Sequence, residues 1–388
     1  MTTEKCLHEP GAARRDTLPQ RLHGLDAVRS GALLLGIVLH SLLPFTDIVW
    51  MINDSERSVV ALWVSGTIHL FRMALFMLLA GYFGRMVTLR RGPGSYFRDR
   101  AKRILLPAVV FWPFTVIPLG FLAMYGASVR GLPAPMASEP VSPLMMFTPG
   151  QLWFLLVLFE LATLVLLARA ALLRFLGTER AGRAATRIGE VLSHPAGVLL
   201  PALAFVAALL LQGGEPAGGI IAPTTIVPEA ASTLGYLGAF LTGWFLHASP
   251  ESMRRIAGNW LPMLVLGLIA TVVVWLPGVP REALMVAVAL AGWLLGFGLL
   301  GAAVRFLDRE HTWIRYLADA SYWMYLVHLP LLVLFEIPLA DLGWPVPVKL
   351  LVTWVVTTAV LLITYELLVR HTWLGAWLNG RRYPRRVR

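Results

Sequence analysis

The chain has 388 residues, of which 57% are hydrophobic and 14% charged, and its mean hydropathy is +0.69. This composition excludes an ordinary soluble domain and predicts an all-α polytopic membrane protein. The formal net charge is +11. In a soluble protein that surplus would suggest nucleic acid, but basic cytoplasmic loops explain it in a membrane protein, so no nucleic-acid partner is expected. The lone cysteine, Cys6, excludes an internal disulfide.

Ten apolar stretches are candidate membrane spans. They lie near residues 25–45, 58–84, 104–125, 148–173, 196–211, 231–248, 260–276, 282–304, 320–337 and 347–370. Most Lys and Arg residues fall in alternate connections, on the side that also holds both ends of the chain. This bias predicts about ten transmembrane helices with both termini in the cytoplasm, and membrane lipids as partners. The expected parts are an N-terminal tail (1–24), a transmembrane domain (25–370) and a basic C-terminal tail (371–388).

The first stretch, LDAVRSGALLLGIVLHSLLPF, carries two ionisable residues on one helix face. Arg29 and His40 are eleven residues apart, about three turns plus 20°, or roughly 16 Å along the axis. Ionisable groups inside a membrane helix are costly without a partner or a cavity, so they mark candidate functional sites. His40 lies in the outer half and suits a general base, while Asp26 can pair with Arg29. The structural alternative is an arginine that reaches lipid headgroups and a histidine hydrogen-bonded in the bundle.

The second stretch places His69 and Arg72 three residues apart on one face, with Arg72 near mid-membrane. A guanidinium there needs a carboxylate, carbonyl groups or a polar cavity. One interpretation is a structural ion pair with Glu160, Glu336 or another buried acid. The other is a group that binds an anionic or carbonyl-bearing substrate and stabilises a developing oxyanion.

The connection after it, SYFRDRAKRILLP, places Arg100 and Arg103 one turn apart among other basic residues. Two guanidinium groups at this spacing can bind a phosphate or pyrophosphate. Positive-inside topology with lipid phosphate contacts also explains them.

Two later stretches add polar groups to the predicted bundle. Glu160 is an acid inside the fourth, and the ninth places Tyr322, Tyr325 and His328 at three-residue steps on one face. That face predicts either a hydrogen-bonded packing seam or a substrate contact. The histidines lack metal-binding spacing, so no metal and no permanently bound cofactor is expected. Phosphate-loop and nucleophilic-serine motifs are also lacking.

Together these segments resemble the acyltransferase 3 family of bacterial inner-membrane O-acyltransferases. The resemblance covers residues 25–370 and rests on five motifs in order: LDAVR with a histidine eleven residues beyond its arginine, FRMALFMLLAGYFGR, RAKR, LWFLLVL and SYWMYLVHLPL. Within the family, the chain is most similar to glucan-modifying members. One departure is Ala80 in AGYF, where members commonly have serine.

The resemblance implies transfer of an acyl group, succinyl in the glucan case, from cytoplasmic acyl-CoA to a hydroxyl of a periplasmic carbohydrate such as glucan. The family's first-helix Arg and His correspond to Arg29 and His40, and its RxxR to Arg100 and Arg103. CoA phosphates are then expected on the RxxR arginines, His40 as base, and Arg72 or a tyrosine at the oxyanion. A route through an acyl-His40 intermediate stays open.

Other classes of function fit the same residues. A transporter or flippase of an anionic solute would also use buried Arg and His. A non-catalytic membrane assembly protein would tolerate loss of His40. An acyltransferase could also use another acceptor, such as peptidoglycan, a lipid-linked sugar or an antibiotic intermediate.

Overall fold

The computed structural model describes residues 23–132, 148–380 and 382–384, and within these ranges the chain forms helices and no β-strand. Predictions that concern residues 1–22, 133–147, 381 and 385–388, including the one for Cys6, lie outside the described residues. The α-helices are α1 (His23–Leu42), α2 (Val59–Arg91), α3 (Pro93–Arg100), α4 (Leu106–Val129), α5 (Trp153–Ser193), α6 (Leu199–Gln212), α7 (Ala230–Leu246), α8 (Ser252–Gly258), α9 (Trp260–Val274), α10 (Arg281–Phe306), α11 (Thr312–Glu336), α12 (Val346–Thr364) and α13 (Trp373–Asn379).

Each of the ten predicted spans coincides with a helix, but the number of spans that helix length supports is smaller. Eight helical segments of the described chain are long and apolar enough to cross a membrane. A ninth is added if α8 and α9, bent by 65° at a short break, form one span. The remaining prediction, 231–248, corresponds to α7, which has 17 residues, ten of them buried. The protein is therefore an all-α polytopic membrane protein, and in the described residues eight helical segments, or nine with the bent pair, are long enough to span a membrane.

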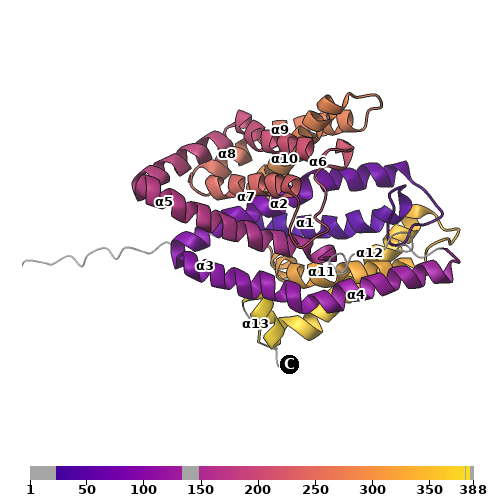
Figure 1. The fold of residues 1–388 in the computed structure, drawn as a ribbon. Coiled ribbons are helices and arrows are strands. Elements are labelled where there is room, and N and C mark those ends of the chain that lie inside the picture. Colours follow the sequence, from indigo (N-terminus) through magenta and orange to yellow (C-terminus); the bar gives the residue numbers. More distant parts are fainter. Residues whose placement is uncertain (1–22, 133–147, 381, 385–388) are drawn as a thin grey trace, which may run out of the picture.

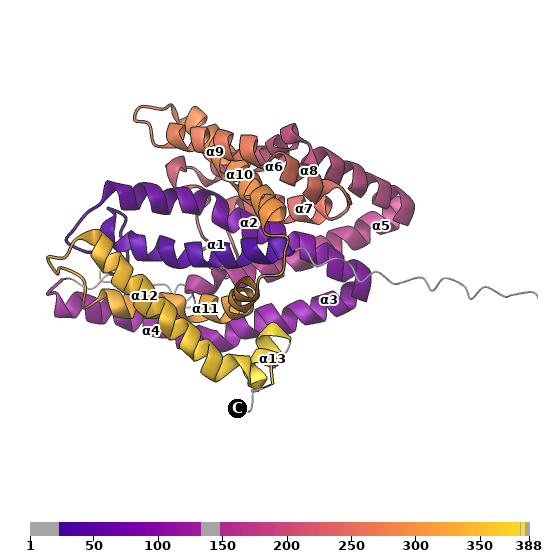
Figure 2. The same cartoon turned by 180° about the vertical axis from the view of Figure 1, so that it is seen from behind.

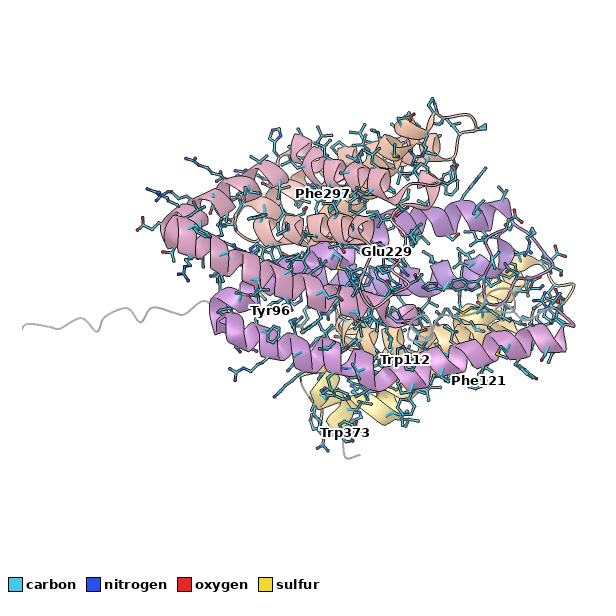
Figure 3. The ribbon with its side chains drawn as sticks, in the orientation of Figure 1. Tyr96, Trp112, Phe121, Glu229, Phe297 and Trp373 are labelled. Atoms are coloured by element: carbon cyan, nitrogen blue, oxygen red, sulfur yellow. The ribbon has the colours of Figure 1, made fainter. Side chains whose placement is uncertain are left out.

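The central helices are α1, α2 and α11, as both ribbon views show (Figures 1 and 2). On one side of them lie α4 and α12, and on the other α6, α9 and α10. Large apolar side chains face outward from the peripheral helices: Phe121 on α4 is 68% exposed and is labelled in Figure 3. Such exposure suits a surface that contacts lipid.

Glycines allow α7 to approach α2 closely. A Cβ at Gly81 on α2 would overlap the carbonyl of Phe240 on α7, and a Cβ at Gly243 on α7 would overlap the carbonyl of Leu78 on α2. The two glycines thus let the helix backbones touch, as small residues do in membrane bundles. This contact fixes α2, which carries His69 and Arg72.

Helix is also present in two basic segments that lie outside the predicted spans. The basic segment after residue 173 continues as helix beyond a break at Gly177, whose φ is +74°. The tail after residue 370 contains α13, whose Trp377 indole donates to the Lys102 carbonyl at 2.8 Å. The start of the tail therefore packs against the RxxR segment.

An ion pair with almost no exposure joins the first loop to α12. The Lys349 ammonium lies 2.8 and 2.9 Å from the two Asp54 carboxylate oxygens, and the two side chains are 1% and 3% exposed. The Glu56 backbone N–H also donates to Asp54. Lys349 lies inside the predicted span 347–370, and Asp54 is its partner.

Candidate functional site

A single large cavity, about 1030 Å³ in volume, runs along α1 between α2, α5 and α11. Asp26 and His40, both in its lining, are fourteen residues apart on α1, which is about 21 Å at 1.5 Å per residue. We call the end near Asp26 the inner end and the end near His40 the outer end, following the predicted topology. The lining also includes residues of the RxxR segment and of the loop 218–224. The cavity therefore spans much of the bundle's thickness.

Nine of the ten predicted site residues line this cavity. They are Asp26, Arg29, His40, His69, Arg72, Arg100, Arg103, Tyr325 and His328. The tenth, Glu160, is half-buried on α5 and does not line it. The structure thus brings together residues from four distant parts of the chain and leaves Glu160 outside.

At the inner end, Arg29 is held by contacts on two helices. Its guanidinium lies 3.6 Å from the Asp26 carboxylate, the pair expected from the i, i+3 spacing. The same guanidinium donates to the Ala318 carbonyl of α11 at 3.1 Å. Arg29 therefore ties α1 to α11 at the mouth of the cavity, with its side chain 40% exposed.

The RxxR arginines share one carboxylate that the sequence analysis did not consider. Asp99 lies 2.6 Å from the Arg100 guanidinium and 3.1 Å from that of Arg103. Arg100 also sits over the ring of the buried Tyr96, labelled in Figure 3, at 5.3 Å. The segment Ala101–Leu105 is a π-helical turn, and the Tyr322 hydroxyl donates to its Arg103 carbonyl at 2.6 Å. The two guanidinium groups are thus oriented by neighbours while remaining partly exposed.

Arg72 lies between the two ends and is 9% exposed. Within the described chain it makes no ion pair within 4.0 Å, and its Nε is buried without a hydrogen-bond partner. The predicted structural alternatives fail here, since Glu160 lies outside the cavity and both carboxylate oxygens of Glu336 are themselves buried without partners. A Cβ at Gly36 of α1 would overlap the Arg72 guanidinium, so this glycine provides the space for it.

At the outer end, His40 lies between two aromatic rings. Its ring is stacked on Trp50 (centroids 5.6 Å apart, planes at 12°) and lies 5.4 Å from the ring of His328. The His40 Nδ1 is buried and has no hydrogen-bond partner within the described ranges. The His328 Nδ1 is 2.8 Å from the Tyr325 carbonyl, and because a carbonyl only accepts, that nitrogen carries a proton. In neutral His328 the basic nitrogen is therefore Nε2.

His69 is oriented in the same way by the neighbouring loop. Its Nε2 lies 3.3 Å from the Ile220 carbonyl, which assigns the proton to that nitrogen. The loop 218–224 closes part of the outer end, and the sequence analysis had not assigned it to the site. Three histidines and one unpaired guanidinium thus line the middle and outer parts of the cavity.

Two further residues of the outer end were missed by the sequence analysis. Gln151, which precedes α5, donates through Nε2 to the Leu326 carbonyl at 2.7 Å, and its own carbonyl accepts from the Tyr325 hydroxyl at 2.7 Å. Trp50, from the first loop, stacks on His40. The sequence shows that the Leu326 carbonyl lacks its usual helical donor, because Pro330 four residues later has no N–H. It does not show which side chain donates to that carbonyl instead.

No metal site is visible in the described part of the chain, where no three His, Cys, Asp or Glu side chains group together. The chemistry available to the cavity is that of imidazole bases, guanidinium cations and fixed hydrogen-bond donors and acceptors. This set suits proton transfer from a hydroxyl and stabilisation of an oxyanion.

A cavity lined by these groups, in an all-α bundle with helices long enough to span a membrane, is typical of membrane proteins that bind or transfer a polar group. The acyltransferase domain model of the acyltransferase 3 family matches residues 22–366 of the chain. The chain therefore belongs to the acyltransferase 3 family, and it is a multi-pass membrane protein.

Curated relatives cover part of the chain. Glucans biosynthesis protein C of Escherichia coli SMS-3-5 is 31% identical over 146 residues, and the proteins of the same name from Shigella dysenteriae serotype 1 and E. coli K12 are 30% identical over the same length. These matches span 37% of this chain and 38% of each relative. No solved structure matches the chain.

Proposed function

We propose that the protein is an inner-membrane O-acyltransferase that moves an acyl group from cytoplasmic acyl-CoA to a hydroxyl of an extracytoplasmic carbohydrate. Periplasmic glucan is the proposed acceptor and succinyl the proposed acyl group. The named relatives support the acceptor, since they are glucans biosynthesis proteins. The single observation that carries the proposal is the cavity itself, with paired arginines at one end and His40 at the other.

The inner end suits the nucleotide part of acyl-CoA. Arg100 and Arg103 are 27% and 38% exposed, and both face the cavity beside Arg29. Guanidinium groups bind phosphates through two parallel hydrogen bonds. Asp99 keeps them oriented before the ligand arrives, and an incoming phosphate then competes with this one carboxylate.

The middle and outer parts of the cavity suit the thioester and its attack. Pantetheine would pass Arg29, and the thioester carbonyl would reach the level of Arg72 and His40. The absence of any carboxylate beside Arg72 in the described chain leaves its guanidinium available to the carbonyl oxygen. An oxyanion in a site of low polarity gains most from such a fixed donor.

The proposed reaction is direct transfer. His40 takes the proton of the acceptor hydroxyl while its oxygen attacks the thioester carbon. Arg72 stabilises the negative charge on the carbonyl oxygen of the tetrahedral intermediate. The carbon–sulfur bond then breaks, and the CoA thiolate takes the proton from His40. The products are the carbohydrate ester and CoA, so protons and electrons balance without an oxidant or reductant.

The test compares wild type with His40→Ala in membrane vesicles, at matched protein levels, using labelled succinyl-CoA and acetyl-CoA with periplasmic glucans. The matched control is His311→Ala, because His311 lies in the loop before α11 and outside the cavity. We expect transfer by wild type and the control, and a loss of at least about a hundredfold in His40→Ala, the usual scale for a general base.

Other results assign a different role. Transfer that persists in His40→Ala excludes His40 as the base and directs the search to His328 or His69. Transfer to another carbohydrate but not to glucan keeps the enzyme and changes the acceptor. Movement of an anionic solute across the vesicle membrane, without ester formation, identifies a transporter instead.

A further inference from the structure

The side-chain amide of Gln151 is fixed at the outer end of the cavity. Its Nε2 donates to the Leu326 carbonyl at 2.7 Å. That carbonyl is available because Pro330, four residues later on α11, has no N–H to donate. The Tyr325 hydroxyl donates to the Gln151 backbone carbonyl at 2.7 Å and holds the residue from the other side.

This hydrogen bond determines which atom of the Gln151 side-chain amide contacts Leu326 and which does not. A carbonyl only accepts hydrogen bonds, so the atom that meets Leu326 is the nitrogen and the amide cannot be reversed. The Oε1 atom is buried and has no hydrogen-bond partner among the described residues, and Gln151 lines the cavity. Burial of an acceptor without a donor is unfavourable, so a ligand that supplies a donor would gain affinity from binding here.

A complementary group lies on the other side of the outer end. The Trp50 Nε1 is buried without an acceptor in the part of the chain that the structure describes, and Trp50 also lines the cavity. Its ring stacks on His40, which in turn neighbours His328. The outer end thus holds one unused acceptor and one unused donor around the proposed base.

We propose that Gln151 and Trp50 form a binding subsite for a second hydroxyl group of the carbohydrate acceptor, distinct from the hydroxyl that is acylated. This inference rests on the proposed function. A hydroxyl both donates and accepts, so a polyol satisfies Gln151 Oε1 and Trp50 Nε1 together, whereas a pantetheine amide would reach this level only by passing the thioester. The subsite makes the enzyme select acceptors with at least two hydroxyls in fixed relation, which sugars have and simple alcohols lack.

The test measures acyl transfer to methyl β-glucoside and to its monodeoxy analogues, with wild type and Gln151→Leu in vesicles. We expect Gln151→Leu to lower kcat/KM for methyl glucoside tenfold to a hundredfold, with the KM for acyl-CoA within about twofold of wild type. At least one deoxy analogue should be a poorer acceptor for wild type and equal to methyl glucoside for Gln151→Leu. That analogue identifies the hydroxyl that Gln151 binds.

A second pair of variants separates binding from support of α11. Pro330→Ala restores a backbone N–H opposite the Leu326 carbonyl, so the double variant Gln151→Leu/Pro330→Ala replaces the structural hydrogen bond but not the Oε1 acceptor. We expect the double variant to stay as defective toward the acceptor as Gln151→Leu.

Several outcomes would overturn the subsite. Recovery in the double variant shows that Gln151 only supports the helix. A rise in the KM for acyl-CoA alone places Oε1 against the donor substrate. Equal discrimination against every deoxy analogue by wild type and Gln151→Leu also rejects it. Failure of wild type to transfer to any glucoside or glucan would overturn the proposed function as well, which distinguishes the two failures.

Discussion

Arg72 and Lys349 are both buried in the bundle, but they differ in whether a carboxylate pairs with them and in whether they line the cavity. Lys349 is 1% exposed and meets both oxygens of the Asp54 carboxylate, whereas Arg72 is 9% exposed and has no carboxylate within 4.0 Å in the described chain. Lys349 is absent from the cavity lining, and Arg72 is part of it. A buried charge is costly unless something compensates it. Asp54 compensates the charge of Lys349, and the compensation that we propose for Arg72 is a bound substrate.

The largest effect that this comparison predicts is a loss of activity in Arg72→Met. We expect kcat to fall about 10²–10³-fold, the usual cost of removing an oxyanion donor. Thermal unfolding in detergent should show a stability equal to or above that of wild type, because the variant no longer buries an uncompensated charge. A variant that unfolds at much lower temperature would show that Arg72 is a structural residue.

The opposite pattern is predicted for Lys349→Met. Removing one partner leaves the Asp54 carboxylate buried alone, which costs about 3–5 kcal/mol of stability. Activity per folded molecule should stay within a few fold of wild type, because neither residue lines the cavity. The double variant Lys349→Met/Asp54→Asn should recover part of the lost stability. If Lys349→Met lost activity without losing stability, Lys349 would not be the structural cation of the pair.

The sequence predicted where the helices lie and which residues share a helix face, but not which residues of distant segments contact each other. The ten apolar stretches located the helices, and helical spacing correctly grouped Arg29 with Asp26 and with His40 along one face. Spacing says nothing about contacts between distant segments, so Lys349 with Asp54 and Gln151 with Leu326 could not be foreseen. The position of Glu160 outside the cavity could not be predicted either, because the sequence does not show in which direction an acidic side chain on a membrane helix points.

A smaller effect is predicted for Gly36→Ala, which disturbs Arg72 without removing it. The added methyl group would overlap the Arg72 guanidinium. We expect kcat to fall about tenfold, since misplacing a catalytic group by about 1 Å can cost up to a hundredfold. The matched control is Gly31→Ala on the same helix, where an added Cβ meets no atom within 4 Å. Equal activity in the two variants would show that the position of Arg72 does not matter.

The smallest effect concerns a third cation, Arg130, which like Lys349 is paired with a carboxylate but whose partner is partly exposed. Arg130 donates to both oxygens of the Asp341 carboxylate in the last loop, and this hydrogen bonding lowers the pKa of Asp341 below its ordinary value. A lowered folded-state pKa stabilises the fold above about pH 4, the usual pKa of aspartate, and the stabilisation disappears as the pH falls through the folded-state pKa.

Asp341→Asn removes the charge and keeps a residue type that tolerates the φ of +64° at this position. Because Asp341 is 41% exposed, we expect a loss of at most about 1 kcal/mol at pH 7. Thermal unfolding of wild type and Asp341→Asn across pH 3 to 7 should show a difference that shrinks toward pH 3. A difference as large as that of Lys349→Met would mean that pairing, and not burial, decides how much a cation contributes to the stability of this bundle.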